Sequence, residues 1–260
     1  MATTTTDPAP RTVSSRASLA VLRSEARLFL REPGSLFWIL VFPTALMTIL
    51  GLIPSFREHD DALGGRRVID LYVPVAVLLA MIMAGLQAMP PVLTGYRERG
   101  ILRRMSTTPV RPSALLGAQI ALHGAAALGS TLLVMAVGRI AFGVRLPAQP
   151  FGYLLGLLLA VACVLALGAL VCAVSRTTKV SAAVGSVVFF VMMFTAGVWV
   201  PVQAMPGTVR HIVQVSPFGA ASQVLDRAAT GAWPSWAYLG VVALWTVLAA
   251  MAAIRTFRWE

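Results

Sequence analysis

Residues 95–116, GYRERGILRRMSTTPVRPSALL, lie between two long apolar segments. An α-helix needs about 20 apolar residues to cross about 30 Å of hydrocarbon, and both flanking segments reach that length. The stretch is therefore predicted to be a charged loop at a membrane surface. We expect a short helix that begins near Arg97 and ends before Pro109, because Ile101, Leu102 and Met105 have the spacing of one helix face. Five arginines give the loop its charge: Arg97, Arg99, Arg103, Arg104 and Arg111.

The composition of the whole chain has the same meaning. Its 260 residues are 58% hydrophobic and 12% charged, with a mean hydropathy of +0.80. Soluble domains are about one quarter charged, so the chain is predicted to be an all-α integral membrane protein. The net charge of +11 does not indicate a nucleic-acid surface, because the arginines cluster beside apolar segments, as membrane topology predicts.

Two different segments precede the first apolar run. Residues 1–15 are rich in Thr, Pro and Ala and are expected to form a disordered tail without the apolar core of a signal peptide. Residues 16–34 are amphipathic, with Arg16, Arg23, Arg27 and Arg31 within about 80° of one another on a helical wheel. This pattern predicts an interfacial helix on the membrane, with a simple cytoplasmic extension as the alternative.

The remainder, residues 35–260, reads as one membrane domain of six spans with a charged loop at 95–113. The expected spans are about 36–53, 71–93, 115–142, 151–174, 180–200 and 236–254. Pro43 in the first span, and Pro74, Pro90 and Pro91 in or near the ends of the second, should bend or break their helices.

Arginine and lysine counts predict which loops face the cytoplasm, since cytoplasmic loops carry the excess of positive charge. With the N-terminus inside, fourteen fall on the cytoplasmic side: Arg11, Arg16, Arg23, Arg27, Arg31, Arg97, Arg99, Arg103, Arg104, Arg111, Arg176, Lys179, Arg255 and Arg258. Seven fall outside: Arg57, Arg66, Arg67, Arg139, Arg145, Arg210 and Arg227. Both termini are therefore expected to be cytoplasmic.

The last outer loop, 201–235, is still half apolar. Met205-Pro206 and Ser216-Pro217 divide it into two candidate short helices, the second closed by Gly231. Apolar residues in an exterior loop favour re-entry into the outer leaflet, where the loop packs on protein. We therefore expect a pair of re-entrant helices here, with Ser216 as the cap of the second one.

The order of residues in the charged loop resembles the first cytoplasmic loop of type-2 ABC exporter permeases, and most closely that of the daunorubicin-resistance type of drug-export permease. The positions that match are Glu98, Arg99, Gly100, Leu102, Arg103, Arg104, Thr107, Thr108 and Pro109. The resemblance implies that this loop carries a coupling helix, which docks on a separate ATPase subunit. It also implies an interfacial elbow helix near the N-terminus, a complex of two permeases and two ATPases, and a bacterial plasma membrane. In the family the last loop has an Asn-Pro turn, where this chain has Ser216-Pro217.

Residues for catalysis are missing from the sequence. A phosphate-binding P-loop needs G-x-x-x-x-G-K-[ST], but the only lysine, Lys179, is followed by Val180. We therefore expect no enzyme activity and no cofactor in this chain, and the resemblance implies that the partner subunit binds ATP and Mg²⁺. His59, His123 and His211 have no metal-ligand spacing, and His123 within a span is either a packing residue or a proton relay. Cys163 and Cys172, nine residues apart on one helix, are expected to remain free and buried.

The fifth span carries the candidate cargo surface. Phe189, Phe190, Met193 and Phe194 form an adaptable apolar group, which favours either a cavity for a hydrophobic cargo or ordinary packing between helices. With the resemblance, this predicts ATP-driven efflux of a hydrophobic small molecule, such as a drug-like natural product or a lipid, by a permease dimer. The alternatives are export of a polysaccharide or lipid-linked glycan, and a membrane scaffold or immunity protein that transports nothing.

Overall fold

The computed structural model describes residues 15–61, 65–105 and 112–256. Side chains are described from residue 18 onward in the first range and from residue 113 onward in the last. The expected tail, residues 1–15, lies outside this part of the chain except for its last residue. The elements are α1 (Ser15–Leu30), α2 (Pro33–Leu36), η1 (Phe37–Val41), α3 (Phe42–Leu52), η2 (Pro54–Phe56), β1 (His59–Asp60), β2 (Arg66–Arg67), α4 (Val68–Ile82), η4 (Met83–Ala88), α5 (Met89–Glu98), α6 (Ile101–Met105), α7 (Pro112–Phe142), α8 (Pro150–Val174), α9 (Thr178–Thr195), η5 (Val202–Ala204), α10 (Gly207–Gln214), α11 (Pro217–Ala229) and α12 (Trp236–Thr256).

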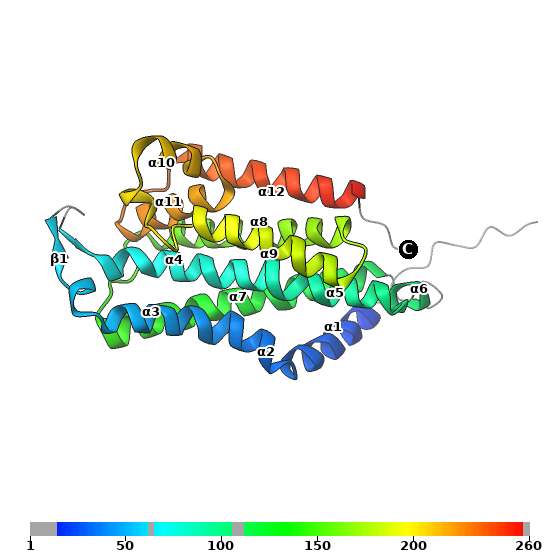
Figure 1. Cartoon of the computed structure of the whole chain (residues 1–260). Helices are drawn as coiled ribbons and strands as arrows, with labels where there is room; N and C mark the ends of the chain where they lie inside the picture. Colours follow the sequence, from blue (N-terminus) through cyan, green and yellow to red (C-terminus); the bar gives the residue numbers. More distant parts are fainter. Residues whose placement is uncertain (1–14, 62–64, 106–111, 257–260) are drawn as a thin grey trace, which may run out of the picture.

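The described residues form a bundle of long helices, and the prediction of an all-α membrane protein is confirmed (Figure 1). Six helical segments are long and apolar enough to cross a membrane: Pro33–Leu52, Val68–Glu98, Ser113–Phe142, Pro150–Val174, Thr178–Thr195 and Trp236–Thr256. The second runs on to Glu98, beyond the predicted end near residue 93, and the charged loop is correspondingly shorter. The fifth stops at Thr195 instead of Val200, because Gly197 turns the chain with a φ of +87°.

The span Val68–Glu98, built from α4, η4 and α5, is the centre of the bundle. Its most apolar window is 83% buried, compared with 61% or less in the other spans. Close contacts surround it: a Cβ on Gly168 of α8 would overlap the Gly85 carbonyl, and one on Gly185 of α9 would lie 2.7 Å from the Leu86 carbonyl oxygen. These glycines let neighbouring backbones approach, as expected for small residues in membrane helices.

The prolines within the spans do not break their helices. Each wide π-helical turn, η1 and η4, comes just before a proline, and the helix continues beyond it. Pro43 has no N–H to donate to the carbonyl of Ile39, and the Ser130 hydroxyl of α7 donates to that oxygen instead, at 2.6 Å. Local widening before Pro43 and Pro90, and at Pro43 a hydrogen bond from α7, thus let these helices continue past their prolines.

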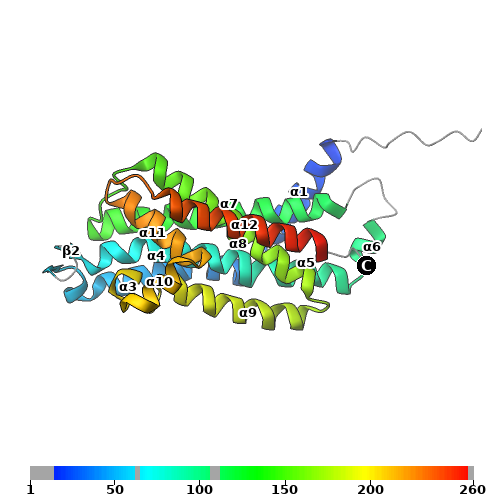
Figure 2. The same cartoon turned by 90° about the horizontal axis from the view of Figure 1, so that it is seen from above.

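The bundle has two different ends. Figures 1 and 2 place α1, α6 and the last turn of α12 together at one end, which we call the α6 end. The opposite end carries the antiparallel pair of β1 and β2, with His59 opposite Arg67, together with α10 and α11. This strand pair is the one departure from an all-helical chain in the described residues.

The predicted pair of short helices in the last loop is confirmed as α10 and α11. The Ser216 hydroxyl accepts a hydrogen bond from the Gly219 N–H at 3.1 Å and so caps α11, as expected. Most of α11 is buried against α8 and α12, including Phe218. Asp226 of α11 binds Arg66 of β2 at 2.6 Å, which ties this loop to the first loop at the same end.

The amphipathic helix is also confirmed, although α1 ends at Leu30 and the chain then turns into α2. Arg23, Arg27 and Arg31 are exposed on one side. Glu25 is buried on the other side, where α1 packs against α7. A buried carboxylate on an interfacial helix needs hydrogen-bond donors, and these belong to the site described next.

Candidate functional site

The last turn of α5 ends at three consecutive residues that each bind a different helix. Successive side chains on an α-helix point about 100° apart, so neighbours in sequence contact different neighbours in space. Tyr96 reaches α1, Arg97 reaches the end of α8, and Glu98 reaches the start of α9. We call Tyr96, Arg97 and Glu98 the α5 hub.

Arg97 holds the end of α8. One guanidinium nitrogen, Nη1, donates to the carbonyl oxygens of Cys172 at 3.0 Å and of Ser175 at 2.8 Å. The last carbonyls of a helix lack partners within it and carry its negative dipole end. A half-buried arginine at this point therefore satisfies α8 and joins it to α5.

Tyr96 holds α1 through a buried carboxylate. The Tyr96 hydroxyl donates to Oε2 of Glu25 at 2.8 Å, and Nε2 of Gln119 on α7 donates to the same oxygen at 2.6 Å. Glu25 is only 8% exposed, so these two donors are what compensates the burial of its charge. The interfacial helix is in this way connected to both α5 and α7.

Glu98 holds the first turn of α9. The Thr178 hydroxyl donates to its carboxylate, and the preceding Thr177 caps α9 by accepting from the Val180 N–H at 3.2 Å. A carboxylate beside a helix N-terminus is favoured by the helix dipole. Glu98, although exposed, therefore links the end of α5 to the start of α9.

A short helix follows the hub after a sharp turn. Gly100 has a φ of +65°, which ends α5 and turns the chain into α6. Leu102 is buried, whereas Arg103 and Arg104 are exposed. Nη2 of Arg104 donates back to the carbonyl of Arg99 at 3.2 Å across the turn. One continuous helix from residue 97 was expected here. The structure instead has two helices, α5 and α6, with Gly100 in the turn between them.

A groove with a charged mouth begins beside the hub and extends into the bundle. It consists of two adjoining pockets of about 710 and 460 Å³, and we call it the α2–η4 groove after the segments that form both. The shared wall is formed by Gly34, Ser35, Gln87 and Ala88. The larger pocket has Arg31, Glu32, Glu98 and Arg99 at its rim, and the smaller has Trp38, Met83 and Phe189.

The predicted cavity residues of α9 do not share one face. Phe189 lines the α2–η4 groove and is 6% exposed, and Met193 is buried with it one turn later. Phe190 is 58% exposed and, like the exposed Phe194, lies on the outer side of α9. The four residues are therefore divided between a buried side of α9, with Phe189 and Met193, and an exposed side, with Phe190 and Phe194.

A comparison of the sequence with protein families agrees with a membrane protein of several spans. The family model described as ABC-2 type transporter matches residues 16–226. The chain belongs to the ABC-2 type transporter family. It is thus a multi-pass membrane subunit of an ABC transporter. Permease domains of this family lack the ATPase site and normally work with a separate ATPase subunit. No individual curated protein is similar enough to the chain to count as a match.

Six of the nine predicted coupling positions of this ABC-2 permease lie in the described residues, from Glu98 to Arg104. The structure brings them together at the turn between α5 and α6. Thr107, Thr108 and Pro109 lie outside the described residues. The sequence reasoning missed Glu25, Tyr96 and Arg97 as connecting residues. A signal for Glu25 was present: it is the one acidic residue of α1, and it lies two residues from both Arg23 and Arg27, which places it on the opposite side of the helix from them.

The remaining candidates, His123, Cys163 and Cys172, are buried in the bundle. Nδ1 of His123 lies 2.9 Å from the Gln119 carbonyl oxygen, and its ring meets the edge of Phe29 at 5.1 Å, so the packing interpretation fits. Cys163 and Cys172 are free and buried, as expected. Within the described ranges, no group of three or more His, Cys, Asp or Glu residues is placed to hold a metal ion.

Proposed function

We propose that this chain is the permease half of an ABC exporter that moves a hydrophobic small molecule out of the cell, driven by a separate ATPase that docks on α6. The observation that carries the proposal is the α5 hub. Three consecutive residues connect the turn before α6 to α1, α8 and α9. A force applied to α6 therefore acts on four helices of the bundle together.

The ATPase contact is assigned to the exposed side of α6. Leu102 anchors this helix to the bundle, while Arg103 and Arg104 face outward. Arginines on a rigid short helix recognise carboxylates on a partner in bidentate geometry. The ATPase and its ATP and Mg²⁺ belong to the other subunit.

The cargo path is assigned to the α2–η4 groove. Its inner pocket is lined by apolar and small residues with Gln87 as a polar group, and none of the described residues that line it is charged. Ligand sites of this kind combine mostly apolar walls with a few placed polar groups. Charges gather at the outer pocket next to the hub, so a hydrophobic body with a polar end fits the groove lengthwise.

Two copies of the permease would complete the path. The outer side of α9 exposes Val187, Phe190, Val191 and Phe194. This surface meets either lipid or a second α9, and the dimer is the arrangement that we propose. The complex lies in a bacterial plasma membrane with the α6 end in the cytoplasm, which the arginine-rich loops at that end support.

The test is recovery of the ATPase. The tagged permease is purified from its own host membranes, and bound ATPase is identified by mass spectrometry. Arg103→Glu with Arg104→Glu should remove the ATPase while membrane insertion is unchanged. Arg176→Glu with Arg255→Glu makes the same change of charge at exposed positions of the α6 end and should retain it.

Transport itself is measured with the recovered complex in proteoliposomes. A hydrophobic dye should move in an ATP-dependent manner and should stimulate ATP hydrolysis. If a lipid-linked glycan stimulated ATP hydrolysis and apolar dyes did not, the permease would be assigned to glycan export instead. Purification without any ATPase would refute the exporter proposal and leave a membrane scaffold.

A further inference from the structure

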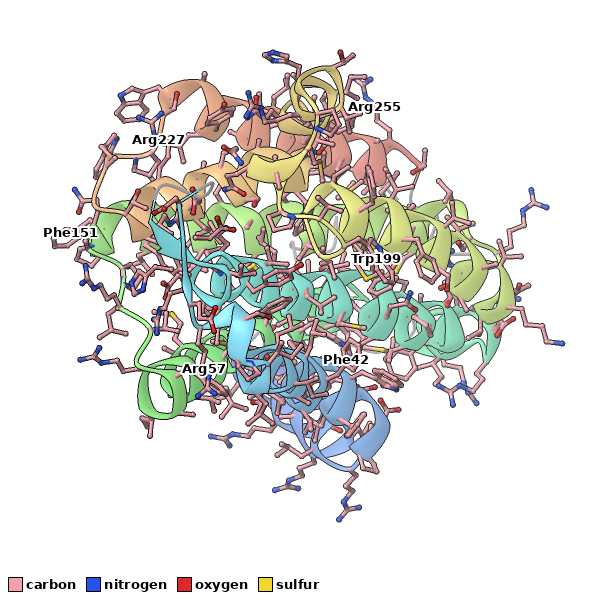
Figure 3. The ribbon with its side chains drawn as sticks, turned by 60° about the vertical axis from the view of Figure 1, so that its left-hand side comes forward. Phe42, Arg57, Phe151, Trp199, Arg227 and Arg255 are labelled. Carbon is pink, nitrogen blue, oxygen red and sulfur yellow. The ribbon has the colours of Figure 1, made fainter. Side chains whose placement is uncertain are left out.

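Another pocket, separate from the α2–η4 groove, lies at the opposite end of the bundle from α6. Its volume is about 580 Å³, and it is formed where the β1–β2 pair, the start of α4, the connection from α7 to α8 and the end of α11 meet. Figure 3 brings this end of the molecule forward and labels Arg57, Phe151 and Arg227, which belong to it. We call it the β2–α8 pocket. It has no part in the coupling or cargo path proposed above.

The lining of this pocket is basic. Three arginines line it, Arg66, Arg67 and Arg145, and Asp70 is the one carboxylate among the described residues of its lining. Arg67 binds Asp70 through two hydrogen bonds of 2.7 and 3.0 Å, and hydrogen bonding to Asp70 raises the pKa of Arg67. Arg66 is held in the same bidentate way by Asp226, behind the pocket wall.

Arg145 is different from the other two arginines. It lies in the connection from α7 to α8, is exposed, and makes no ion pair or hydrogen bond with any other described residue. The pairs Arg66–Asp226 and Arg67–Asp70 are each close to neutral. The unpaired Arg145 therefore gives the described lining of the pocket a net positive charge. His59 at the lining of the pocket carries no negative charge to offset it.

A buried hydroxyl supplies an independent observation. Tyr153, in the first turn of α8, lines the pocket and is only 3% exposed. Its hydroxyl has no hydrogen-bond partner among the described residues. Buried tyrosine hydroxyls usually have a partner, and this one can donate to an oxygen atom of a ligand in the pocket.

The position of the pocket indicates where such a ligand comes from. Exposed apolar side chains lie at this end of the bundle, on the last turn of α7, the first turns of α8 and α12 and the connections before them: Ile140, Leu146, Phe151, Trp233 and Trp236. Tryptophans at the ends of spans mark the level of the lipid headgroups. A basic pocket at this level, between membrane helices, meets the phosphates of the surrounding lipid.

We propose that the β2–α8 pocket binds the phosphate of an anionic phospholipid headgroup. Arg145 forms the ion pair with the phosphate, the Tyr153 hydroxyl donates a hydrogen bond to it, and Arg66 and Arg67 form the fixed basic wall. The acyl chains then lie along the apolar ends of α7 and α8. Zwitterionic phosphatidylcholine has the same phosphate, but its ammonium group meets the arginines unfavourably.

The test uses thermal unfolding of the full chain, purified in detergent and stripped of lipid. The readout is a maleimide dye that fluoresces on reaction with Cys163 and Cys172, which become accessible only on unfolding. Phosphatidylglycerol, phosphatidylcholine, dioleoylglycerol and inorganic phosphate are titrated separately. Phosphatidylglycerol should raise Tm in a saturable manner and more than the other three.

Two variants and one control locate the effect. Arg145→Gln and Tyr153→Phe should each raise the phosphatidylglycerol concentration for half of the Tm increase by about ten-fold, since each removes a hydrogen bond to a charged phosphate. Arg57→Gln makes the same change of charge at the same end but outside the pocket, and it should titrate like the wild-type chain.

Three results would overturn the proposal. An equal loss in Arg57→Gln would mean unspecific attraction of anionic lipid to this end. A lower Tm of Tyr153→Phe without lipid, with an unchanged lipid response, would make the hydroxyl a purely structural group. A full Tm increase with inorganic phosphate alone would replace the lipid by a free anion.

Discussion

The hydrogen bonds at Glu25 provide the sharpest test of how the interfacial helix is attached. Tyr96→Phe removes the bond from the Tyr96 hydroxyl to the Glu25 carboxylate, 2.8 Å long, and leaves the aromatic ring in place. A hydrogen bond to a charged group contributes about 1.5–3 kcal/mol. Glu25 keeps its second donor, Gln119, at 2.6 Å, so we expect a loss of about 2 kcal/mol in the free energy of unfolding.

Glu25→Ala should cost at least as much as Tyr96→Phe. It leaves the Tyr96 hydroxyl and the Gln119 amide without an acceptor, at about 1–3 kcal/mol for each unsatisfied buried donor. It also removes a carboxylate whose burial was itself unfavourable. We expect a net loss of about 2–4 kcal/mol from these opposing effects. Glu25→Gln keeps an acceptor oxygen but loses the charge, and should lie near half of that value.

The assay is dye labelling of the two buried cysteines during heating. For a chain of this length, 1 kcal/mol changes Tm by about 2–4 °C, so Tyr96→Phe should lower Tm by about 4–8 °C. The double variant Glu25→Ala with Tyr96→Phe should be less destabilised than the sum of both, by about 1–2 kcal/mol. Glu32→Ala removes an exposed carboxylate of the same region and should stay within about 0.5 kcal/mol. If Glu25→Ala behaves like Glu32→Ala, or if the double variant is additive, Glu25 does not hold α1 to α5.

Three further predictions concern packing, orientation and the groove. Gly168→Ala should lower Tm sharply or prevent purification, because the added methyl group overlaps the Gly85 backbone; an unchanged Tm would contradict this close contact. A cysteine at exposed Ser55 should react with an impermeant maleimide added to intact cells and one at exposed Arg176 should not, with the reverse pattern inverting the orientation. Phe189→Ala should weaken binding of a hydrophobic cargo by about ten-fold or more, measured by dye titration, whereas Phe190→Ala should leave it near the wild-type value; equal effects would move the cargo away from the α2–η4 groove.

The six spans, the amphipathic helix and the two short helices of the last loop were predictable because each depends on local composition. A run of about 20 apolar residues has few alternatives to a membrane helix. Ser216 before Pro217 gives the cap of α11 by its own chemistry, and the structure has that hydrogen bond. The prolines were harder to interpret, because the fate of the Ile39 carbonyl depends on Ser130, 91 residues away.

The candidate site was predictable only in part, since its contacts are long-range. The loop sequence gave the position of α6 and its two exposed arginines. It gave no indication that the span before it would continue to Glu98, because Tyr96 and Arg97 look like loop residues until their partners are placed. The backbone carbonyls of Cys172 and Ser175, which Arg97 binds, have no signature in the sequence, since every residue has a backbone carbonyl.

The position of Gly100 explains why the hub and α6 are arranged in this order. With a φ of +65° this residue ends α5 directly after Glu98 and Arg99, so the hub occupies the last full turn of the central span. A side chain other than glycine is strained in this conformation, which ties the direction of α6 to that residue. Because Tyr96, Arg97 and Glu98 bind α1, α8 and α9, the end of the central span cannot shift alone. A displacement of α6 must either move those helices together or break one of three identified contacts, and each contact is accessible to a single substitution.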